Sequence, residues 1–244
     1  MVEFGSTGYT AGVSALVVFG ANGPTGRRVV GQALAADHRV VAVTRKPAEF
    51  PLSSPNLEIV SADVTDPSGV DRAIDGADAV ISTYGVPYGR AEITVYSHGI
   101  ANITQAMTAR GVSRLVCVSS TTVATDDAPG ESLLWRKVIG PFLRNNLGRT
   151  LYDDMERMEH IVVNSGLDWT IVRPGGLFDA EVPTDDYYVG PPRLSGRVTS
   201  RADLADLLVK EATEPRYSRA IVDVITRSAR PSPLNFLKEA FGVG

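Results

Sequence analysis

Residues 15–26 read Ala-Leu-Val-Val-Phe-Gly-Ala-Asn-Gly-Pro-Thr-Gly, an apolar run that leads directly into three glycines spaced three residues apart. The run 15–19 is typical of a buried strand, and residues 25–36 carry apolar side chains at helical spacing. Glycines at this spacing allow a tight turn, close approach of a pyrophosphate and close packing of a helix on a sheet. The helix start adds unpaired N–H groups and a positive dipole end. The stretch therefore predicts a strand, a phosphate-binding turn and a helix.

The residues of this turn are the first predicted cofactor contacts. A glycine triplet alone is weak evidence, because a plain glycine-rich connection needs no ligand. The triplet carries weight here because it lies at the first strand-to-helix junction of an alternating pattern. The predicted contacts are Gly20, Asn22, Gly23, Pro24, Thr25 and Gly26.

The rest of the chain repeats the alternation of short apolar runs and longer helical patterns. Strands that are apolar on both faces and separated by helices are typical of a parallel sheet covered on each side. We expect an α/β fold, a Rossmann-type doubly wound parallel sheet in a single domain. Predicted strands are 39–44, 57–60, 79–82, 114–119, 168–173 and 220–225, and predicted helices are 70–74, 91–110, 151–165 and 201–213.

Domain organisation follows from the same pattern. Residues 1–13 are rich in Gly, Ser and Thr and are predicted to form a flexible N-terminal tail, and 14–244 are predicted to form an NAD(P)-binding domain. Two stretches near 121–150 and 177–199 are too long for simple connections, and long loops in compact domains are usually functional. Both follow the carboxyl ends of predicted strands, so we expect them on the substrate side.

Composition excludes several classes of protein. The 24 basic and 28 acidic residues give a net charge of −4, which offers no electrostatic footprint for nucleic acid or an anionic membrane. A single cysteine, Cys117, rules out an internal disulfide and a thiolate metal cluster. No apolar run approaches the ~20 residues of a spanning helix, and no Lys or Arg precedes Arg27. We expect a cytoplasmic protein, a monomer or weak homodimer, that binds a small molecule and neither nucleic acid nor membrane.

Cofactor preference is read at the end of the second predicted strand. An NAD site usually has an acidic residue there, whereas this chain has Arg45 and Lys46. These cations can bind a 2′-phosphate, Arg45 through its planar fork, so we expect NADP(H) to bind tightly and NAD(H) more weakly. Alternatively, both are solvated charges at a strand end. Asp63 follows the third strand and can meet the adenine edge or simply cap its loop.

From 15 to about 225 the sequence resembles the atypical short-chain dehydrogenase/reductases, the branch with NmrA-like proteins and flavin reductase/biliverdin reductase B. The resemblance rests on Gly20-Ala-Asn-Gly-Pro-Thr-Gly26, Val43-Thr-Arg45, Ala62-Asp63-Val64, Asp78-Ala-Val-Ile81, Gly111-Val-Ser-Arg-Leu-Val116, Ser119-Ser120 and Ser165-Gly-Leu-Asp-Trp-Thr-Ile-Val-Arg-Pro174. It implies that Thr83 and Gly85 line the cofactor cleft and that Pro174 and Gly175 lie beside the nicotinamide. The remaining cofactor contacts expected from these motifs are Asp63, Val64 and Ser119.

The resemblance fails at the usual catalytic helix. Most short-chain dehydrogenases carry Tyr-x-x-x-Lys there, on one helical face, so that Lys lowers the pKa of the Tyr acid. Alignment places Leu151 and Met155 at these positions, with Tyr152 rotated roughly 100° away. Ser120 matches the family's serine and is the predicted catalytic residue; alternatively, it caps a loop.

The missing pair favours one kind of acceptor. Hydride addition to an isolated ketone demands a proton donor, whereas addition to a flavin, quinone or tetrapyrrole gives a delocalised anion. We therefore expect an NADPH-dependent oxidoreductase acting on a conjugated acceptor. Two alternatives stay open: a non-catalytic NmrA-like NADP sensor, and a carbonyl reductase or isomerase with a displaced tyrosine acid. Candidate substrate contacts, each of which is otherwise a packing residue, are Tyr84, Tyr88, Trp135 and Tyr152.

Overall fold

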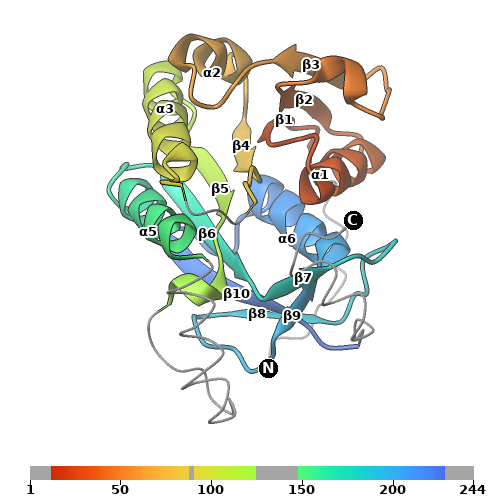
Figure 1. The fold of residues 1–244 in the computed structure, drawn as a ribbon. Coiled ribbons are helices and arrows are strands. Elements are labelled where there is room, and N and C mark those ends of the chain that lie inside the picture. Colours follow the sequence, from red (N-terminus) through yellow and green to blue (C-terminus); the bar gives the residue numbers. More distant parts are fainter. Residues whose placement is uncertain (1–11, 88–90, 125–147, 229–244) are drawn as a thin grey trace.

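The computed structural model describes residues 12–87, 91–124 and 148–228, which build an α/β fold around one eight-stranded sheet (Figure 1). The predicted tail up to residue 11, Tyr88, Trp135 and most of the stretch 121–150 lie outside these residues. The strands, in spatial order, are β3 (Leu57–Ser61), β2 (Arg39–Thr44), β1 (Ala15–Phe19), β4 (Ala79–Ser82), β5 (Arg114–Val118), β6 (Asp168–Pro174), β10 (Ala220–Thr226) and β8 (Tyr187–Gly190).

The strand order reverses direction at β1, which is the position where doubly wound sheets bind ligands. β1 pairs in parallel with β2 on one side, Val17 opposite Val41, and with β4 on the other, Val17 opposite Val80. The carboxyl ends of β1, β2 and β4 therefore meet at one edge of the sheet. The order matches the predicted Rossmann-type fold.

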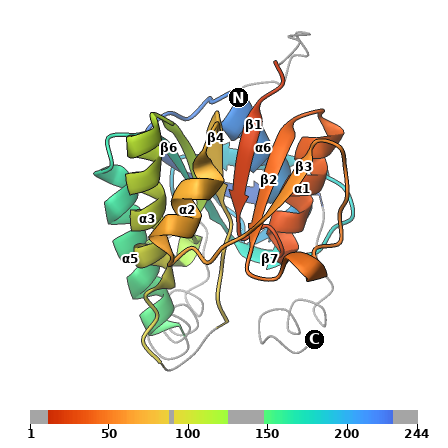
Figure 2. The same ribbon diagram turned by 90° about the horizontal axis from the view of Figure 1, so that it is seen from above.

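Helices cover both faces, which is why the central strands are apolar on both sides. α1 (Pro24–Ala35) and α6 (Arg201–Thr213) pack together on one face. α2 (Pro67–Ile74), α3 (Val95–Arg110) and α5 (Arg149–Val163) cover the other face (Figure 2). Each face has its own hydrophobic core, with Phe19 in one and Leu16 in the other.

The stretch near 177–199 contributes strands that the sequence pattern did not predict. β7 (Gly176–Phe178) pairs in parallel with β9 (Val198–Ser200), and β8 joins the main sheet antiparallel to β10. These strands are three or four residues long, too short to show a periodicity. The stretch therefore extends the main sheet through β8.

Helices α1 and α5 begin at Pro24 and Arg149, close to their predicted starts, but two other helix starts lie further from the prediction. α2 begins at Pro67 rather than Val70, because the Asp66 carboxylate accepts hydrogen bonds from the N–H groups of Ser68 and Gly69. α3 begins at Val95 rather than near Ala91. Across the described parts of the chain, no helix is both long and apolar enough to cross a bilayer.

Candidate cofactor and acceptor site

The glycine turn is packed so tightly at Gly20 and Gly26 that side chains are excluded there. Gly20 has a φ of +78°, and a Cβ added there would lie 2.4 Å from the backbone nitrogen of Tyr84. A Cβ added at Gly26 would lie 2.2 Å from the carbonyl oxygen of Gly20. The Gly23 N–H donates to that same carbonyl at 3.0 Å. The turn is thus a backbone cradle between β1, β4 and the start of α1.

The start of α1 suits an anion. Gly23 is its N-cap, Pro24 follows, and among the described residues no side chain caps the exposed N–H groups. Thr25 is buried in the first turn. Asn22 accepts two hydrogen bonds from Arg27, at 2.7 and 3.0 Å, which orient the loop in front of the helix. These features fit the pyrophosphate of a dinucleotide.

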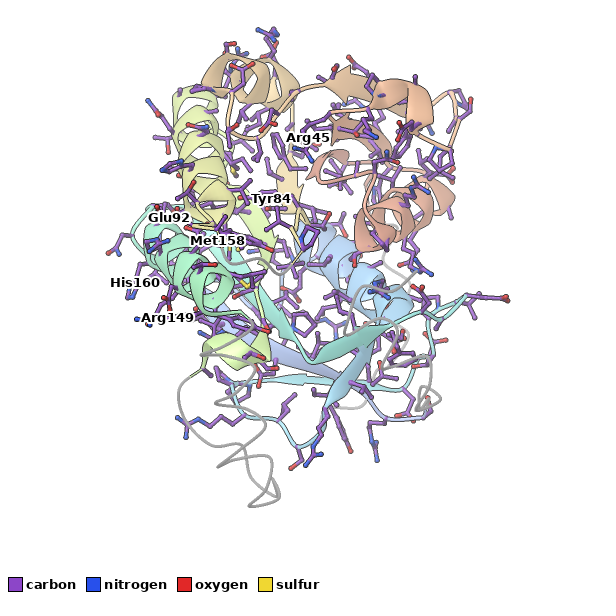
Figure 3. The ribbon with its side chains drawn as sticks, viewed as in Figure 1. Arg45, Tyr84, Glu92, Arg149, Met158 and His160 are labelled. Atoms are coloured by element: carbon purple, nitrogen blue, oxygen red, sulfur yellow. The ribbon has the colours of Figure 1, made fainter. Side chains whose placement is uncertain are left out.

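Arg45 and Lys46 follow β2 but have different partners. Lys46 Nζ lies 3.0 Å from the Glu49 carboxylate, in the short helix η1 (Pro47–Glu49). Arg45 is 78% exposed, and its guanidinium lies 3.7 Å from the Asp63 carboxylate. In Figure 3, Arg45 lies in the central part of the view between α3 and α1. Of the two cations, Arg45 is the one more readily available to a phosphate.

Asp63 is held by its own loop. Its Oδ1 accepts from the Thr65 N–H at 2.9 Å and from the Thr65 hydroxyl at 2.7 Å. These hydrogen bonds, with a smaller contribution from Arg45, hold the pKa of Asp63 below its ordinary value. The neighbouring Val64 packs against Gly99 of α3. Asp63 therefore caps its loop and remains anionic beside Arg45.

The residues after β4 close the edge of the sheet. The Thr83 hydroxyl donates to the carbonyl oxygen of Phe19 at 3.0 Å, tying β4 to β1. The Tyr84 hydroxyl donates to the carbonyl oxygen of Tyr96 at 3.1 Å, and burial strongly raises the pKa of Tyr84. Gly85 is exposed beside them. This geometry matches the packing interpretation of Tyr84, whose phenol faces α3.

The two serines after β5 have separate roles. Ser119 is 3% exposed, and its hydroxyl donates to Glu159 of α5 at 2.5 Å. The Ser120 hydroxyl accepts from the Thr122 N–H at 3.2 Å, as the N-cap of η2 (Thr121–Val123). Ser120 is thus a loop cap, as in the alternative interpretation of this residue. A hydroxyl that accepts one bond still has its proton to donate to a bound molecule.

α5 presents apolar side chains at the positions aligned with the family's Tyr and Lys. Leu151 is 5% exposed and Met155 packs against the same core cluster. Tyr152 is also 5% exposed and belongs to that cluster. Figure 3 shows His160 and Arg149 on the outer side of α5. Tyr152 therefore lies in the core beneath the site's edge.

The end of β6 is fixed by a residue that sequence reasoning missed. Thr199 of β9 accepts from the Gly175 N–H at 2.9 Å and donates to the carbonyl oxygen of Val224 at 2.6 Å. A Cβ at Gly175 would lie 2.7 Å from the carbonyl oxygen of Arg197. Pro174 is buried at the end of β6. The β7–β9 pair therefore holds the Pro174–Gly175 turn at the sheet edge.

A buried ion pair beneath this edge was also missed. Arg173 and Glu159 are 8% and 6% exposed, and they form two hydrogen bonds with each other. A signal was present in the sequence: Arg173 interrupts an apolar strand, and Glu159 lies on the apolar face of its helix, eight residues after Leu151. Charges at such positions are rarely buried without a partner.

Comparison with known proteins agrees with this geometry. Residues 20–215 match the model of a family described as NAD(P)H-binding. The chain belongs to this NAD(P)H-binding family. The match begins at the glycine turn and ends after α6, so it includes the carboxyl ends of β2 to β6 but not β10. It also bears out the resemblance seen in the sequence.

The relatives of this protein differ in length and in what their names say of them. An uncharacterized chloroplastic protein of Arabidopsis thaliana is 32% identical over 225 residues, 88% of this chain and 77% of that protein. A (4-alkanoyl-5-oxo-2,5-dihydrofuran-3-yl)methyl phosphate reductase of Streptomyces griseus is 30% identical over 159 residues, 65% of this chain and 46% of that enzyme. Uncharacterized mycobacterial relatives are longer: this chain spans 23% of their length at 26% identity.

Solved structures show the same fold. A short-chain dehydrogenase/reductase of Veillonella parvula, in complex with NADP, aligns with a TM-score of 0.72 and 17% identity, covering 90% of this chain and 99% of that one. A Streptococcus pneumoniae protein thought to be an NADH-flavin reductase aligns with a TM-score of 0.67 and 20% identity, covering 88% and 100%. At these identities the likeness concerns the fold alone.

Proposed function

We propose that this protein is an NADPH-dependent reductase of a conjugated acceptor, such as a flavin, a quinone or an unsaturated ring ketone or lactone. The observation that carries the proposal is the apolar face of α5, where Leu151 and Met155 occupy the positions aligned with the family's Tyr and Lys. Of the two nearby phenols, Tyr152 is buried in the core and Tyr84 is partly buried and packs against it. The protein's contribution to the reaction at this edge is therefore mainly to bind and orient the reactants and to exclude water.

The cofactor is assigned to the carboxyl edge of the sheet. The turn of Gly20, Gly23 and Gly26 with the start of α1 is suited to the pyrophosphate, because no side chain among the described residues caps the N–H groups in the first turn of α1. Arg45 is assigned to the 2′-phosphate, and Asp63 and Val64 to the adenosine end. When bound, NADPH supplies a hydride from its nicotinamide, which we assign to the side of Ser120 and Pro174–Gly175.

A conjugated acceptor fits a site where Leu151 and Met155 stand at the positions of the family's proton-donating pair. Reduction of such a molecule spreads negative charge over several atoms, so the reaction depends less on a placed acid. The name of the Streptomyces griseus relative describes reduction of an oxo-dihydrofuran, a ring in which a double bond is conjugated with a carbonyl. That name supports the same class of acceptor here.

We assign the protein to the cytoplasm, as a monomer or weak homodimer.

A second candidate is a non-catalytic NADP sensor. It is favoured by Ser120, whose hydroxyl already caps η2. Such a protein would bind NADPH without consuming it. Carbonyl or isomerase chemistry with Tyr84, Tyr88 or Tyr152 as a displaced acid is a third candidate. It is less favoured for Tyr152, which is buried in the core, and for Tyr84, which packs against it, while Tyr88 lies outside the described residues.

Steady-state NADPH oxidation separates these candidates. The purified protein is assayed with flavins, quinones, unsaturated lactones and simple aldehydes, each against a blank without protein to remove direct reduction. Turnover of conjugated acceptors but not aldehydes is the expected result. NADPH binding without any turnover would favour the sensor, and turnover confined to aldehydes or saturated ketones would contradict the proposal.

A further inference from the structure

Four buried polar side chains form a row across three strands near the carboxyl edge of the sheet. Asp223 of β10 is the register partner of Arg173 of β6, and Ser119 follows β5 level with Arg173, since Val118 pairs with Val172. Glu159 enters the row from α5. Their exposed fractions are 3% for Ser119 and Asp223, 6% for Glu159 and 8% for Arg173.

Glu159 is the centre of the row. Its Oε1 accepts from the Ser119 hydroxyl at 2.5 Å and from Arg173 Nε at 2.9 Å, and its Oε2 accepts from Arg173 Nη2 at 2.5 Å. Two parallel bonds from one guanidinium fix direction as well as distance. One carboxylate on α5 therefore ties together the ends of β5 and β6.

The row continues into the substrate-side stretch through Asp223. Its carboxylate accepts from the backbone N–H groups of Arg193 at 2.5 Å and Leu194 at 3.2 Å. A few residues further along, the Arg197 carbonyl oxygen accepts from the Gly176 N–H at 2.7 Å. The chain around the end of β6 is thus held from below by Glu159 and from the side by the loop that Asp223 fixes.

The residues fixed by the row directly precede the proposed reaction site. Ser120 follows Ser119, and Pro174–Gly175 follows Arg173. A buried ion pair is weak evidence for stability, because apolar residues of similar volume often serve equally well. We therefore consider whether the Arg173–Glu159 pair fixes the relative positions of the strand ends that it joins.

We propose that Glu159 is a positioning residue, which sets the Ser120 turn relative to the Pro174–Gly175 turn by binding Ser119 and Arg173 together. The inference rests on the proposed function, because it assigns these turns to the nicotinamide and acceptor. It adds that alignment at this end of the site depends on a side chain that touches neither molecule.

The protein contains a matched control at the opposite ends of the same strands. Arg114 begins β5, and its Nη2 lies 3.3 Å from Oε2 of Glu211 on α6. Arg114 is 6% exposed and Glu211 1% exposed. Glu211 thus resembles Glu159 in residue type, burial and partner, but it lies at the amino ends of the strands, away from the proposed site.

The test compares Glu159→Gln with Glu211→Gln. Each variant is measured for thermal unfolding, for the affinity of adenosine 2′,5′-bisphosphate, for the fluorescence of bound NADPH and for turnover. Both are expected to unfold at lower temperature and to bind the bisphosphate, the adenosine half of the cofactor, within about twofold of wild type. Only Glu159→Gln is expected to shift nicotinamide emission and to lower kcat, by about 10- to 100-fold, the range for a small misplacement of reacting groups.

Failure of this inference is distinguishable from failure of the proposed function. If wild type binds NADPH and the two variants show the same emission and turnover, Glu159 is merely structural and the inference is overturned alone. If wild type does not bind NADPH, both are overturned. If Glu159→Gln does not fold, Ser119→Ala is tested instead, because it removes one partner of Glu159 and keeps the ion pair with Arg173. Ser119→Ala is then expected to shift the NADPH emission and to lower kcat several-fold. Wild-type emission and turnover in Ser119→Ala would overturn the inference.

Discussion

At the scale of single residues, adjacent side chains of the same charge have different roles because their partners differ. Lys46 is paired with Glu49 at 3.0 Å, whereas Arg45 is 78% exposed and lies 3.7 Å from Asp63. Exposed pairs at the longer distance contribute little to stability and are readily exchanged for a stronger partner. A 2′-phosphate is such a partner for a guanidinium.

We expect Arg45→Ala to weaken NADPH binding by about 1.5–3 kcal/mol, the range for a charge-assisted hydrogen bond, and to leave NADH binding nearly unchanged. Lys46→Ala is the matched control and should change either affinity much less. Titration calorimetry with both cofactors measures the difference. Equal losses for NADPH and NADH would show that Arg45 does not contact the 2′-phosphate.

Ser120 and Tyr152 are also expected to differ in their effect on turnover, because their surroundings differ. Tyr152 lies in the core, so Tyr152→Phe is expected to change kcat only a few-fold. Ser120→Ala should lower kcat about tenfold, or about 1.4 kcal/mol of transition-state stabilisation, through lost orientation. A placed phenol acid contributes roughly 10²–10⁴-fold, so a loss beyond about a hundredfold in folded Tyr152→Phe would instead make Tyr152 the acid.

At the scale of elements, a buried carboxylate of α5 binds the start of α3, in addition to the packing of the two helices. Asp154 is fully buried and accepts from the backbone N–H groups of Tyr96 at 2.9 Å and Ser97 at 3.3 Å, in the first turn of α3. It therefore caps a helix other than its own. Since α5 also carries Glu159, the orientation of α5 affects both the core and the proposed site.

We expect Asp154→Ala to lower the free energy of unfolding by about 2–4 kcal/mol, because it leaves buried N–H groups without their anionic acceptor. Arg157→Ala removes the exposed partner of the same carboxylate, which donates at 3.3 Å, and should cost less than about 1 kcal/mol. Urea unfolding of both variants tests the comparison. Similar losses would mean that the ion pair, rather than the cap, stabilises the contact.

At the scale of the whole molecule, shifted carboxyl groups divide into two regions. Three carboxyl groups between β3 and α3 have pKa values lowered by hydrogen bonds that they accept. Thr65 donates to Asp63, Ser68 to Asp66 and Arg110 to Asp71. Burial raises the pKa of Glu211 and of Asp223, near β5, β6 and β10. Protonation of these carboxyl groups at low pH therefore destabilises the first region of the folded protein and stabilises the second.

The sign follows from proton linkage. A carboxyl whose pKa is lowered by folding stabilises the native state above its unfolded pKa, and that contribution is lost as the pH falls through the folded value. Protonation of Glu211 and Asp223 instead relieves the cost of burying their charge. As the pH falls below the ordinary Asp value of 3.8, hydrogen exchange should show α2 losing protection before β6 and β10. Loss of protection in the reverse order would contradict the assignment.

Much of this fold is determined by local patterns. The glycine turn, the central strands and α6 were predicted because apolar periodicity and glycine spacing are properties of neighbouring residues. α6 has the predicted bounds 201–213, and β2 the predicted bounds 39–44. The family followed from motifs at strand ends, where the requirements of a bound dinucleotide are also local.

The tertiary structure decided which side chains face the edge of the sheet and which are buried beneath it. Glu159 meets Ser119 across 40 residues, and Thr199 meets Val224 across 25, and no local pattern records such contacts. β8 is a strand because the longer β10 offers it hydrogen bonds, and β7 and β9 are strands because they pair with each other. Sequence determined the glycine turn, the central strands and the main helices, since propensity and periodicity act over a few residues. The arrangement of the site was decided by packing, because burial depends on segments that meet only in the folded chain.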